Sequence, residues 1–319
     1  MINDQGLYPV YGGNGLRGFT GSYNHDGDYI LIGRQGALCG NVRKVTGKTY
    51  VTEHAIAVCA SKEHETTFLQ HLFQKMRLGQ YSDQSAQPGL AVNKLLRLNI
   101  NVPSKNEQGK IAKILSLIDE RITTQNKIIE DLKKLKSAIR KRIFTSLKNE
   151  HTENYEINQL FAYEQPSAYI VANDEYSADT TLTPVLTANK GFVLGYTDED
   201  FGIYQKGECI IFDDFTMDAK YVSFPFKVKS SAIKILTAKL NVNLRFMFEY
   251  LSYLGLKSEE HKRHYISEIA SLVIELPSKE KQNRIANLMT SLDNKLALEE
   301  KVKAKYEDKK QYLLSQMFI

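Results

Sequence analysis

Acidic residues and a lysine gather in the run DDFTMDAK, which spans residues 213–220. Carboxylates clustered like those of Asp213, Asp214 and Asp218 can hold Mg²⁺, and Lys220 beside them could help to activate a water molecule. A metal-dependent nuclease that uses these four residues is therefore one hypothesis for the chain. Two observations weigh against it: Asp-x-Lys is a three-residue pattern that arises easily by chance, and the comparable stretch GRQGALCGNV contains no acidic residue.

Three other strings have the residue types of nucleotide-binding or catalytic sites. Residues 13–18 fit the pattern G-x-G-x-x-G, but turn and strand formers follow them where a dinucleotide site needs a helix. Residues 47–49, Gly-Lys-Thr, end like a phosphate-binding loop, yet Val42 stands where its first glycine is required. Cys39 and His54 could form a nucleophile pair, although a cysteine on a strand is more often packed in a core. We therefore expect neither a dinucleotide site nor an ATP site.

Loops rich in glycine, amide and guanidinium groups indicate a different chemistry, the reading of DNA bases. Arginine pairs with guanine, and asparagine or glutamine pairs with adenine. The alternative is that the Gly and Asn residues only form turns and the Lys and Arg residues only face water. The hypothesis therefore concerns the loops as groups more than any single member. The candidate residues are Asn14, Arg17, Arg34, Gln35, Asn41 and, as a phosphate contact, Lys44, followed later in the chain by Asn189, Lys190, Thr216 and Lys220.

An internal repeat indicates which elements position these loops. Residues 103–145 align without a gap with residues 277–319, at an offset of 174. Ten identities over 43 positions, with like-for-like exchanges between them, are poorly explained by chance. The first members of the identical pairs are Pro103, Ser104, Lys105, Gln108, Ile111, Ala112, Asp119, Lys127, Lys136 and Phe144.

Each copy of the repeat predicts one long helix. Proline followed by serine is typical of a helix start, and Ser104 with Glu107 forms a capping box that Lys281 leaves incomplete in the second copy. Apolar residues recur at three- and four-residue spacing. Because a lone helix of about 60 Å would be unstable, we expect the two helices to pack as an antiparallel coiled coil. Its packing residues are Ile111, Leu115, Ile118, Ile122 and Leu132 in the first copy and Ile285, Met289, Leu292, Leu296 and Tyr306 in the second.

A β-rich segment precedes each helix. Runs such as DYILIG and TYVTEHAIAV in the first segment, and ECIIFDDF and KYVSFPFKV in the second, alternate with turn residues, and a shorter helical stretch follows each set. The predicted fold is α+β, with two β-rich domains separated by two long helices packed as an antiparallel coiled coil. The boundaries are 1–102 for the first β-rich domain, 103–150 for the first helix, 151–276 for the second domain and 277–319 for the second helix.

The first β-rich domain starts late relative to the second. Pro9 and Pro184 occupy comparable places, but Pro184 lies 33 residues after His151, where the second domain begins. Roughly two dozen residues at the front of the second domain therefore lack a counterpart in the first. A naturally short product and a lost start both account for this, and whether the shortened domain still reads DNA stays open.

The composition fits a protein that folds in a reducing compartment. Apolar residues make up 42% and charged residues 25%, and the formal net charge of +5 permits nucleic acid as a partner without requiring it. Three widely spaced cysteines form no disulfide or zinc pattern. No apolar run has membrane-spanning length, and the N-terminus does not read as a signal peptide. We therefore expect a soluble cytoplasmic protein with no membrane partner.

The duplicated plan resembles the specificity (S) subunits of type I restriction-modification enzymes. The repeated P-S-K-x-x-Q-x-x-I-A…D segment is similar to that family's helical regions, and residues 8–42 and 183–236 are similar to its target-recognition domains. The resemblance covers almost the whole chain and departs from the family at the short front end. It implies two recognition domains that each read half of a bipartite DNA site, with the helices as a spacer.

The resemblance also implies a complex. The expected partners are double-stranded DNA, methyltransferase (M) subunits docked on the helices and a restriction (R) subunit. S-adenosylmethionine, ATP and Mg²⁺ would belong to these partners, and this chain would bind no cofactor and catalyse no reaction; it contains no N-P-P-[YF] methyltransferase string. The alternatives are the nuclease that uses Asp213, Asp214, Asp218 and Lys220, a truncated non-functional specificity allele, and a purely structural coiled-coil protein.

Overall fold

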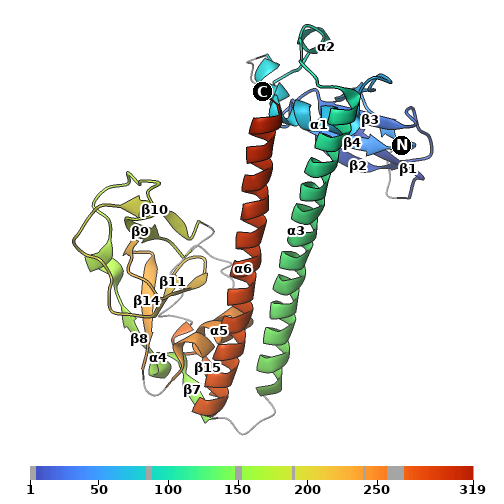
Figure 1. Cartoon of the computed structure of the whole chain (residues 1–319). Helices are drawn as coiled ribbons and strands as arrows, with labels where there is room; N and C mark the ends of the chain where they lie inside the picture. The colour runs from blue at the N-terminus through green and yellow to red at the C-terminus, as the bar shows by residue number, and fades with distance from the viewer. Residues whose placement is uncertain are drawn as a thin grey trace. The chain divides into compact units, whose positions relative to one another are not determined.

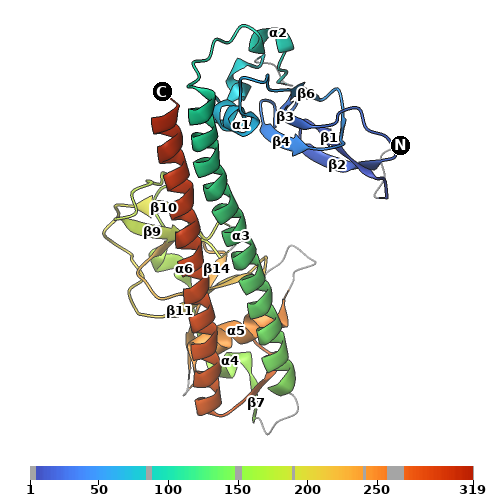
Figure 2. The same cartoon turned by 45° about the vertical axis from the view of Figure 1, so that its right-hand side comes forward.

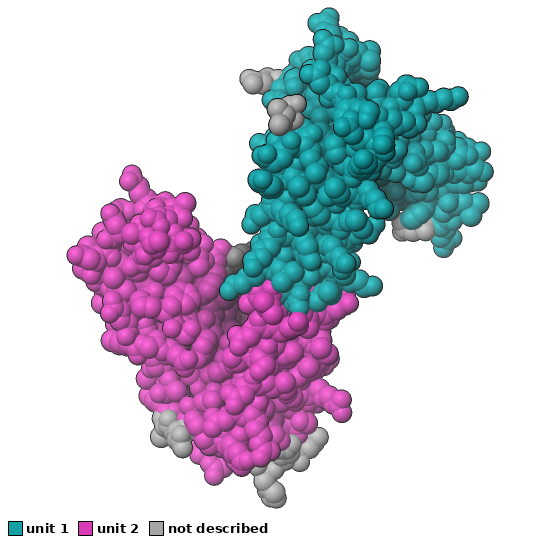
Figure 3. Space-filling model, viewed as in Figure 1, with its two compact units in different colours: residues 1–128, 299–319 teal, residues 129–298 magenta. Residues whose placement is uncertain are grey.

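The computed structural model describes residues 5–83, 88–147, 153–188, 191–239, 242–256 and 269–318. They form two compact units (Figure 3): unit 1 consists of residues 1–128 and 299–319, and unit 2 of residues 129–298. Two long helices, α3 (Lys105–Leu147) and α6 (Lys279–Met317), therefore have one part in unit 1 and the other part in unit 2. They lie side by side in both cartoon views (Figures 1 and 2).

Two small sheets form the β part of unit 1 (Figure 1). In the first, β1 (Tyr8–Gly12) is antiparallel to β2 (Gly15–Thr20) and parallel to β5 (Tyr50–Val51). In the second, β3 (Asp28–Gly33) lies between β4 (Val42–Thr46) and β6 (Ala55–Val58) and is antiparallel to both.

Short helices complete unit 1. Helix α1 (Thr66–Lys75) packs against β3 and β4, and it places Phe68 and Leu72 against Ile30 and Ile32 in the core. The 3₁₀ turn η1 (Leu78–Tyr81) and helix α2 (Val92–Leu95) follow before α3 begins.

Unit 2 repeats this topology. Strand β9 (Thr183–Leu186) is antiparallel to β10 (Val193–Thr197) and parallel to β13 (Lys227–Val228). Strand β11 (Cys209–Asp213) lies between β12 (Ala219–Val222) and β14 (Ile233–Ala238), and helix α5 (Leu244–Leu254) packs against β11 and β12. The predicted α+β fold, with two β-rich parts and two long helices packed together, is confirmed.

Unit 2 also contains a segment that the described part of unit 1 lacks. Strand β7 (Glu153–Glu156) pairs with β15 (Val273–Leu276), helix α4 (Ile157–Leu160) follows, and β8 (Phe161–Glu164) adds a fourth strand at the β14 edge. A 3₁₀ turn, η2 (Pro166–Tyr169), comes next. No described strand or helix of unit 1 corresponds to β7, α4 or β8, which agrees with the late start of the first β-rich domain.

The starts of the long helices follow the sequence pattern. The Ser104 backbone N–H donates to Glu107 Oε2 at 3.1 Å, and the Glu107 backbone N–H donates to the Ser104 hydroxyl at 3.5 Å, which together form the predicted capping box. In α6 the Lys281 backbone N–H donates to the Ser278 hydroxyl at 3.4 Å, and lysine offers no acceptor for the return bond.

The ten predicted packing residues of the helix pair are all buried or half-buried. Polar groups interrupt the apolar stripe at equivalent repeat positions. In unit 1 the Gln125 amide donates to the Glu299 carbonyl at 3.2 Å, and Lys310 pairs with Asp119 at 2.6 Å. In unit 2 the equivalent lysine, Lys136, pairs with the equivalent aspartate, Asp293, at 2.5 Å. Both units therefore use the same polar contact, with the roles of α3 and α6 exchanged.

A buried glutamine ties the first turns of each long helix to the unit in which that helix begins. Gln108 donates to the Pro103 carbonyl at 2.9 Å, and its side-chain oxygen accepts from the Glu65 backbone N–H, at the N-cap of α1. Gln282 makes the same two bonds in unit 2, to the Pro277 carbonyl and from the backbone N–H of Asn243, the N-cap of α5. This match aligns α1 with α5 at an offset of 178.

Unit 2 contains a buried ionic cluster around Glu249 of α5. Its fully buried carboxylate bonds Arg140 Nε at 2.8 Å and Arg245 at 2.5 Å, and Lys136 lies 3.4 Å away. Breaking a buried pair by removing one charge leaves the other charges uncompensated. The cluster therefore locks α5 against α3.

Unit 1 has His71 at the position equivalent to Glu249. Its ring is buried, and Nδ1 lies 3.9 Å from the Asp119 carboxylate, too far for a hydrogen bond. Burial lowers the pKa of His71, and this effect outweighs the opposing attraction of Asp119. The ring is therefore neutral in the folded chain at neutral pH.

Among the residues that the structure describes, no helix combines the length and apolar character that crossing a bilayer requires.

Replacing Glu249 should strongly destabilise unit 2. We expect Glu249→Gln to lower the free energy of unfolding by about 3–5 kcal/mol, because Arg140 loses its buried carboxylate partner and Lys136 and Arg245 keep only the more exposed Asp293. Glu280→Gln is the matched control: Glu280 also pairs with an arginine four positions away, but both side chains are about three-quarters exposed, so a change below about 1 kcal/mol is expected. Urea unfolding followed by circular dichroism measures both, and equal effects would contradict this account.

Stability should fall on acidification because of His71. Its folded pKa lies below the unfolded value near 6.5, so the unfolded chain binds the proton more tightly. The stabilising contribution is complete above about pH 6.5 and is lost as the pH falls from there towards the folded pKa. We expect His71→Gln to reduce the drop in urea midpoint between pH 7.5 and 5.5. The control His54→Gln, whose side chain is 39% exposed, should retain the drop. An unchanged drop in His71→Gln would refute this role.

Candidate nucleic-acid interface

Three loops of unit 1 meet at one end of its sheets. They are the turn Gly13–Asn14 between β1 and β2, the loop 34–41 between β3 and β4, and the residues before β6. The Arg34 backbone N–H donates to the His54 carbonyl at 2.9 Å. A Cβ atom at Gly13 would lie 2.8 Å from that same carbonyl oxygen, so only glycine permits this approach.

Guanidinium groups surround this loop cluster. Arg17, Arg34 and Arg43 are exposed. Two of them pack on the β1–β2 hairpin. A Cβ at Gly12 would lie 3.0 Å from Arg17 of β2, and one at Gly15 would lie 2.9 Å from Arg43 of β4. Such donors suit phosphate oxygens or the guanine edge.

The sequence reasoning did not include Arg43 among the candidates. A signal was present, because β4 places Val42 and Val45 in the core with Arg43 exposed between them. The position of the arginine beside Gly15, 28 residues away in the chain, comes from folding alone.

The other predicted residues of unit 1 divide into two groups. Asn14, Gln35 and Asn41 are exposed in the loop cluster, and Gln35 Oε1 lies 3.0 Å from His54 Nδ1. Lys44 is placed differently: its amine donates to the Thr67 hydroxyl at 3.1 Å and pairs with Asp28 at 3.4 Å. Lys44 thus joins β4 to the start of α1.

In unit 2, Thr216 and Lys220 belong to the equivalent hairpin. Thr216 is exposed in the β11–β12 turn, and Lys220 is half-buried on β12. The Asp214 backbone N–H donates to the Ala232 carbonyl at 2.9 Å, which repeats the bond between Arg34 and His54 in unit 1. Asn189 and Lys190, predicted in the β9–β10 turn, lie outside the described residues.

The acidic run of the β11–β12 hairpin has structural roles. The buried Asp213 carboxylate accepts from the backbone N–H groups of Phe215 and Thr216, both at 2.9 Å, and so shapes the turn. The buried Asp214 lies 3.5 Å from the buried Lys234, whereas Asp218 is exposed. Across the described parts of the chain, no three His, Cys, Asp or Glu residues are grouped to hold a metal ion. The nuclease hypothesis is therefore not supported.

The remaining strings also have structural explanations. Residues 13–18 form the turn of the β1–β2 hairpin and the first part of β2, not a strand-to-helix turn, so the dinucleotide interpretation fails. The Cys39 thiol donates to the Arg34 carbonyl at 3.4 Å, and burial raises the pKa of Cys39. A neutral thiol is a weak nucleophile, while His54 contacts Gln35 and Glu53.

Comparison with known proteins relates this architecture to one family. The model of the type I restriction modification DNA specificity domain matches residues 1–134 and 149–307. The specificity subunit of the Escherichia coli type I restriction enzyme EcoprrI is 48% identical over 124 residues, which cover 39% of this chain and 30% of that protein. The Escherichia coli EcoR124I/EcoR124II specificity subunit is 43% identical over 127 residues, covering 38% and 31%. The matched part thus spans about a third of these relatives.

A solved structure shares the fold over the whole chain. The type I restriction-modification S subunit from M. genitalium superposes with a TM-score of 0.73 and covers 100% of this chain and 90% of its own. Its 18% sequence identity means that the likeness concerns the fold alone.

The structural role of Asp213 predicts separate effects for two nearby aspartates. Asp213→Ala should cost about 1–3 kcal/mol of unfolding free energy, because two backbone donors of the turn lose their acceptor. Asp218→Ala, on the same hairpin but exposed, should change it by no more than about 0.5 kcal/mol. Urea unfolding measures both. Mg²⁺-dependent DNA cleavage that disappears in Asp218→Ala would instead restore the nuclease hypothesis.

Proposed function

Because this chain belongs to the family of type I restriction-modification DNA specificity subunits, we propose that it recognises a bipartite DNA site for a methyltransferase and restriction complex. Each unit would read one half of the site through its loop cluster. The long helices would join the two readers and leave the bases between the half-sites unread.

The duplication carries this proposal. Each unit contains two matching sets of three strands and one matching helix, and an equivalent glutamine ties that helix to one of two equivalent long helices. Two unlike half-sites can be read by one scaffold that is present twice and carries different loops in each copy. The loops do differ: the position of the exposed Arg34 in unit 1 is taken in unit 2 by Asp214, which is buried and paired with Lys234.

The chemistry of the loop cluster in unit 1 supports DNA as the ligand. Arg17, Arg34 and Arg43 supply charged donors, while Asn14 and Gln35 supply amides that can both donate and accept. This mixture suits contacts to phosphates and to base edges. We propose direct base reading for Asn14, Arg34 and Gln35.

The outer faces of the helices support a scaffolding role. In unit 1, Ile114, Leu117 and Ile128 of α3 are between 38% and 52% exposed, and exposed apolar groups of this kind favour a protein partner. We propose that methyltransferase subunits dock on the long helices and that a restriction subunit joins the complex. S-adenosylmethionine, ATP and Mg²⁺ would then serve catalysis in those partners.

The proposal predicts loss of recognition when the arginines of unit 1 are removed. The chain is co-expressed with the methyltransferase subunit from its own genome, and methylated bases are mapped by single-molecule sequencing. We expect a bipartite methylated motif. The double variant Arg34→Ala, Arg43→Ala should weaken DNA binding of the complex at fixed salt at least about tenfold, because Arg34 would lose a base contact that contributes about 1–3 kcal/mol and Arg43 would lose a charged contact to phosphate. It should also remove or relax one half of the motif.

The matched control is the double variant Lys62→Ala, Arg97→Ala, which removes two exposed charges of unit 1 outside the loop cluster. It should leave the motif unchanged and alter only the salt dependence of binding. A complex that assembles but methylates no site would indicate a silent specificity subunit. Failure to form any complex with the methyltransferase subunit would refute the proposal.

A further inference from the structure

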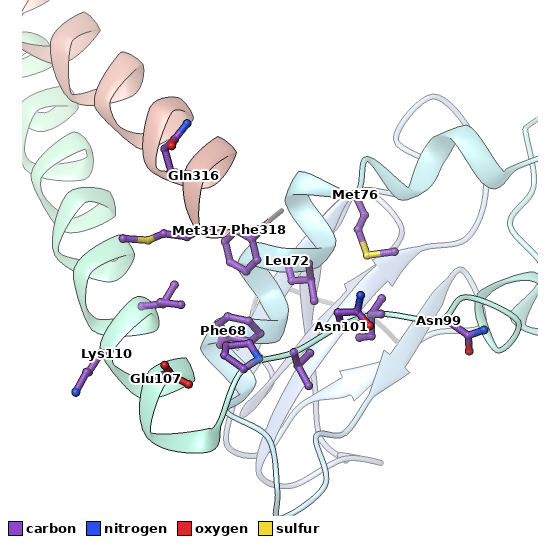
Figure 4. A pocket seen from close by; sticks show the side chains of 14 residues that line it. Phe68, Leu72, Met76, Asn99, Asn101, Glu107, Lys110, Gln316, Met317 and Phe318 are labelled. Carbon is purple, nitrogen blue, oxygen red and sulfur yellow. The ribbon is translucent and has the colours of Figure 1, made fainter.

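Helix α1 borders two hollows of unit 1. On one face, Phe68 and Leu72 lie beside Phe318 of α6 and line a groove of about 740 Å³ (Figure 4). On an adjoining face, α1 and α3 border a second pocket of about 600 Å³. Every side chain that lines this second pocket, except that of a lysine, can accept a hydrogen bond. Its lining includes Lys44 of β4, Thr67 and His71 of α1, and Ser116, Asp119 and Glu120 of α3.

His71 gives the second pocket an unsatisfied polar group. Its side chain is 1% exposed, and neither ring nitrogen has a hydrogen-bond partner among the described residues. Gln74 approaches the ring, but not with the geometry of a hydrogen bond. Nδ1 lies 3.9 Å from the Asp119 carboxylate, and a neutral ring offers one acceptor nitrogen. A donor that entered between these two acceptors would satisfy both.

In unit 2 a guanidinium group fills the equivalent place. Arg245 of α5 donates to Glu249 at 2.5 Å and also bonds Asp293 of α6. Its guanidinium carbon lies 5.1 Å from the ring centroid of Tyr221 on β12. One planar group therefore bridges the short helix and the long helix while it rests on the sheet.

Unit 1 keeps acceptors at this place but lacks the guanidinium. The same two helices are present, α1 in the place of α5 and α3 in the place of α6. The pocket thus lies where an arginine side chain lies in unit 2. The repeat offsets give the counterparts of the three bonded residues: Thr67 for Arg245, His71 for Glu249 and Asp119 for Asp293.

Lys44 is the only cation among the residues that line the pocket. Its amine donates to the Thr67 hydroxyl at 3.1 Å and pairs with Asp28 at 3.4 Å, so its charge is compensated on the sheet. Arg245 in unit 2 also has a cation nearby, because Lys136 pairs with the same two carboxylates. A lysine at the edge of the pocket is therefore compatible with a bound guanidinium.

The carboxylates at the pocket leave one negative charge uncompensated. Asp119 Oδ1 pairs with Lys310 at 2.6 Å, which neutralises that carboxylate. Glu120 is exposed and forms no ion pair within the described part of the chain. Because the lysine of β4 and its aspartate partner also cancel, the charged groups sum to −1. One added cation would balance them.

We propose that this pocket receives an arginine side chain of the methyltransferase subunit. The guanidinium would donate to the acceptor nitrogen of His71, to Asp119 Oδ2 and to the Glu120 carboxylate. Its five donors lie in one rigid plane, so a single group can reach acceptors on α1 and α3 together. An ammonium group, with three donors on one atom, would bridge them less well.

The surroundings of the pocket indicate that the occupant belongs to a protein. Leu117 is 52% exposed and lies three residues before Glu120, and Ile128 is 38% exposed and lies four residues after Thr124. Residues three or four apart share one face of a helix. The pocket therefore adjoins the exposed apolar residues of α3 that suit a protein partner. The identity of that partner rests on the proposed function, whereas the chemistry of the pocket does not.

A small guanidinium compound tests the pocket by itself. The probe is N-acetyl-L-arginine methylamide, titrated into the full 319-residue chain with ¹⁵N-labelled histidine. Nuclear magnetic resonance follows the ring nitrogens of His71, whose signals are those missing from the His71→Gln variant. We expect a saturable shift with a dissociation constant of about 1–10 mM, as suits one side chain. The matched citrulline compound, which has a similar shape but no charge, should bind at least about tenfold more weakly.

Variants of the chain locate the probe. Asp119→Asn should weaken binding at least about tenfold, because a charged acceptor is lost. Asp131→Asn, which removes an exposed carboxylate of α3 in unit 2, should stay within about twofold. Thr67→Arg keeps both carboxylates and should abolish probe binding, because the chain then fills the pocket as Arg245 does in unit 2. Circular dichroism checks that each variant folds.

The methyltransferase subunit tests the partner. Its binding to the chain is measured by isothermal titration calorimetry. Thr67→Arg should weaken this binding at least about tenfold, because the arginine of the partner finds the pocket occupied. Ser61→Arg is the matched control: it adds the same charge at an exposed site of unit 1 that does not line the pocket, and it should stay within about twofold.

Three results would overturn this site. The first is the lack of a saturable shift of His71 with about 50 mM probe, a concentration that would nearly fill a site of the expected affinity. The second is equal binding of the arginine and citrulline compounds. The third is a folded Thr67→Arg chain that binds the methyltransferase subunit as tightly as the wild type. A wild-type chain that binds no methyltransferase subunit would instead overturn the proposed function and, with it, the partner assigned here.

Discussion

Two buried glutamines hold the architecture together. Gln108 and Gln282 each join the proline carbonyl before a long helix to the N-cap amide of the neighbouring short helix. A buried amide left without partners would cost about 1–3 kcal/mol, so one docking of the helix is strongly favoured. Because a helix buries only one stripe, fixing that docking also decides which residues of α3 and α6 face each other.

The duplicated frame allows the two units to diverge elsewhere. Asp119 with Lys310 and Asp293 with Lys136 keep the same contact. Equivalent positions of α5 and α1 hold Glu249 in unit 2 and His71 in unit 1. Unit 1 therefore has a neutral ring where unit 2 has a buried ionic cluster. The loops differ as well. The shared sheets and helices therefore set the geometry of each unit, and the loops set the chemistry of its surface.

Local sequence patterns predicted most of the secondary structure. Serine caps and three-four apolar spacing located α3 and α6, and alternation with turn residues located most strands of both sheets. The segment β7–α4–β8 was missed, because Glu153–Glu164 mixes polar and apolar residues without a clear period. The acidic run was ambiguous for a similar reason, since spacing alone does not distinguish a metal site from an aspartate that shapes a turn.

By itself, the sequence determined the repeat, the two long helices and the unequal front ends, because these depend on residues close together in the chain. Only the tertiary structure decided which distant groups meet. Gln108 reaches Glu65 across 43 positions, Arg43 lies beside Gly15, and Arg140 bonds Glu249 across 109 positions. Such pairings depend on how the sheets and helices pack, and no local period encodes that packing.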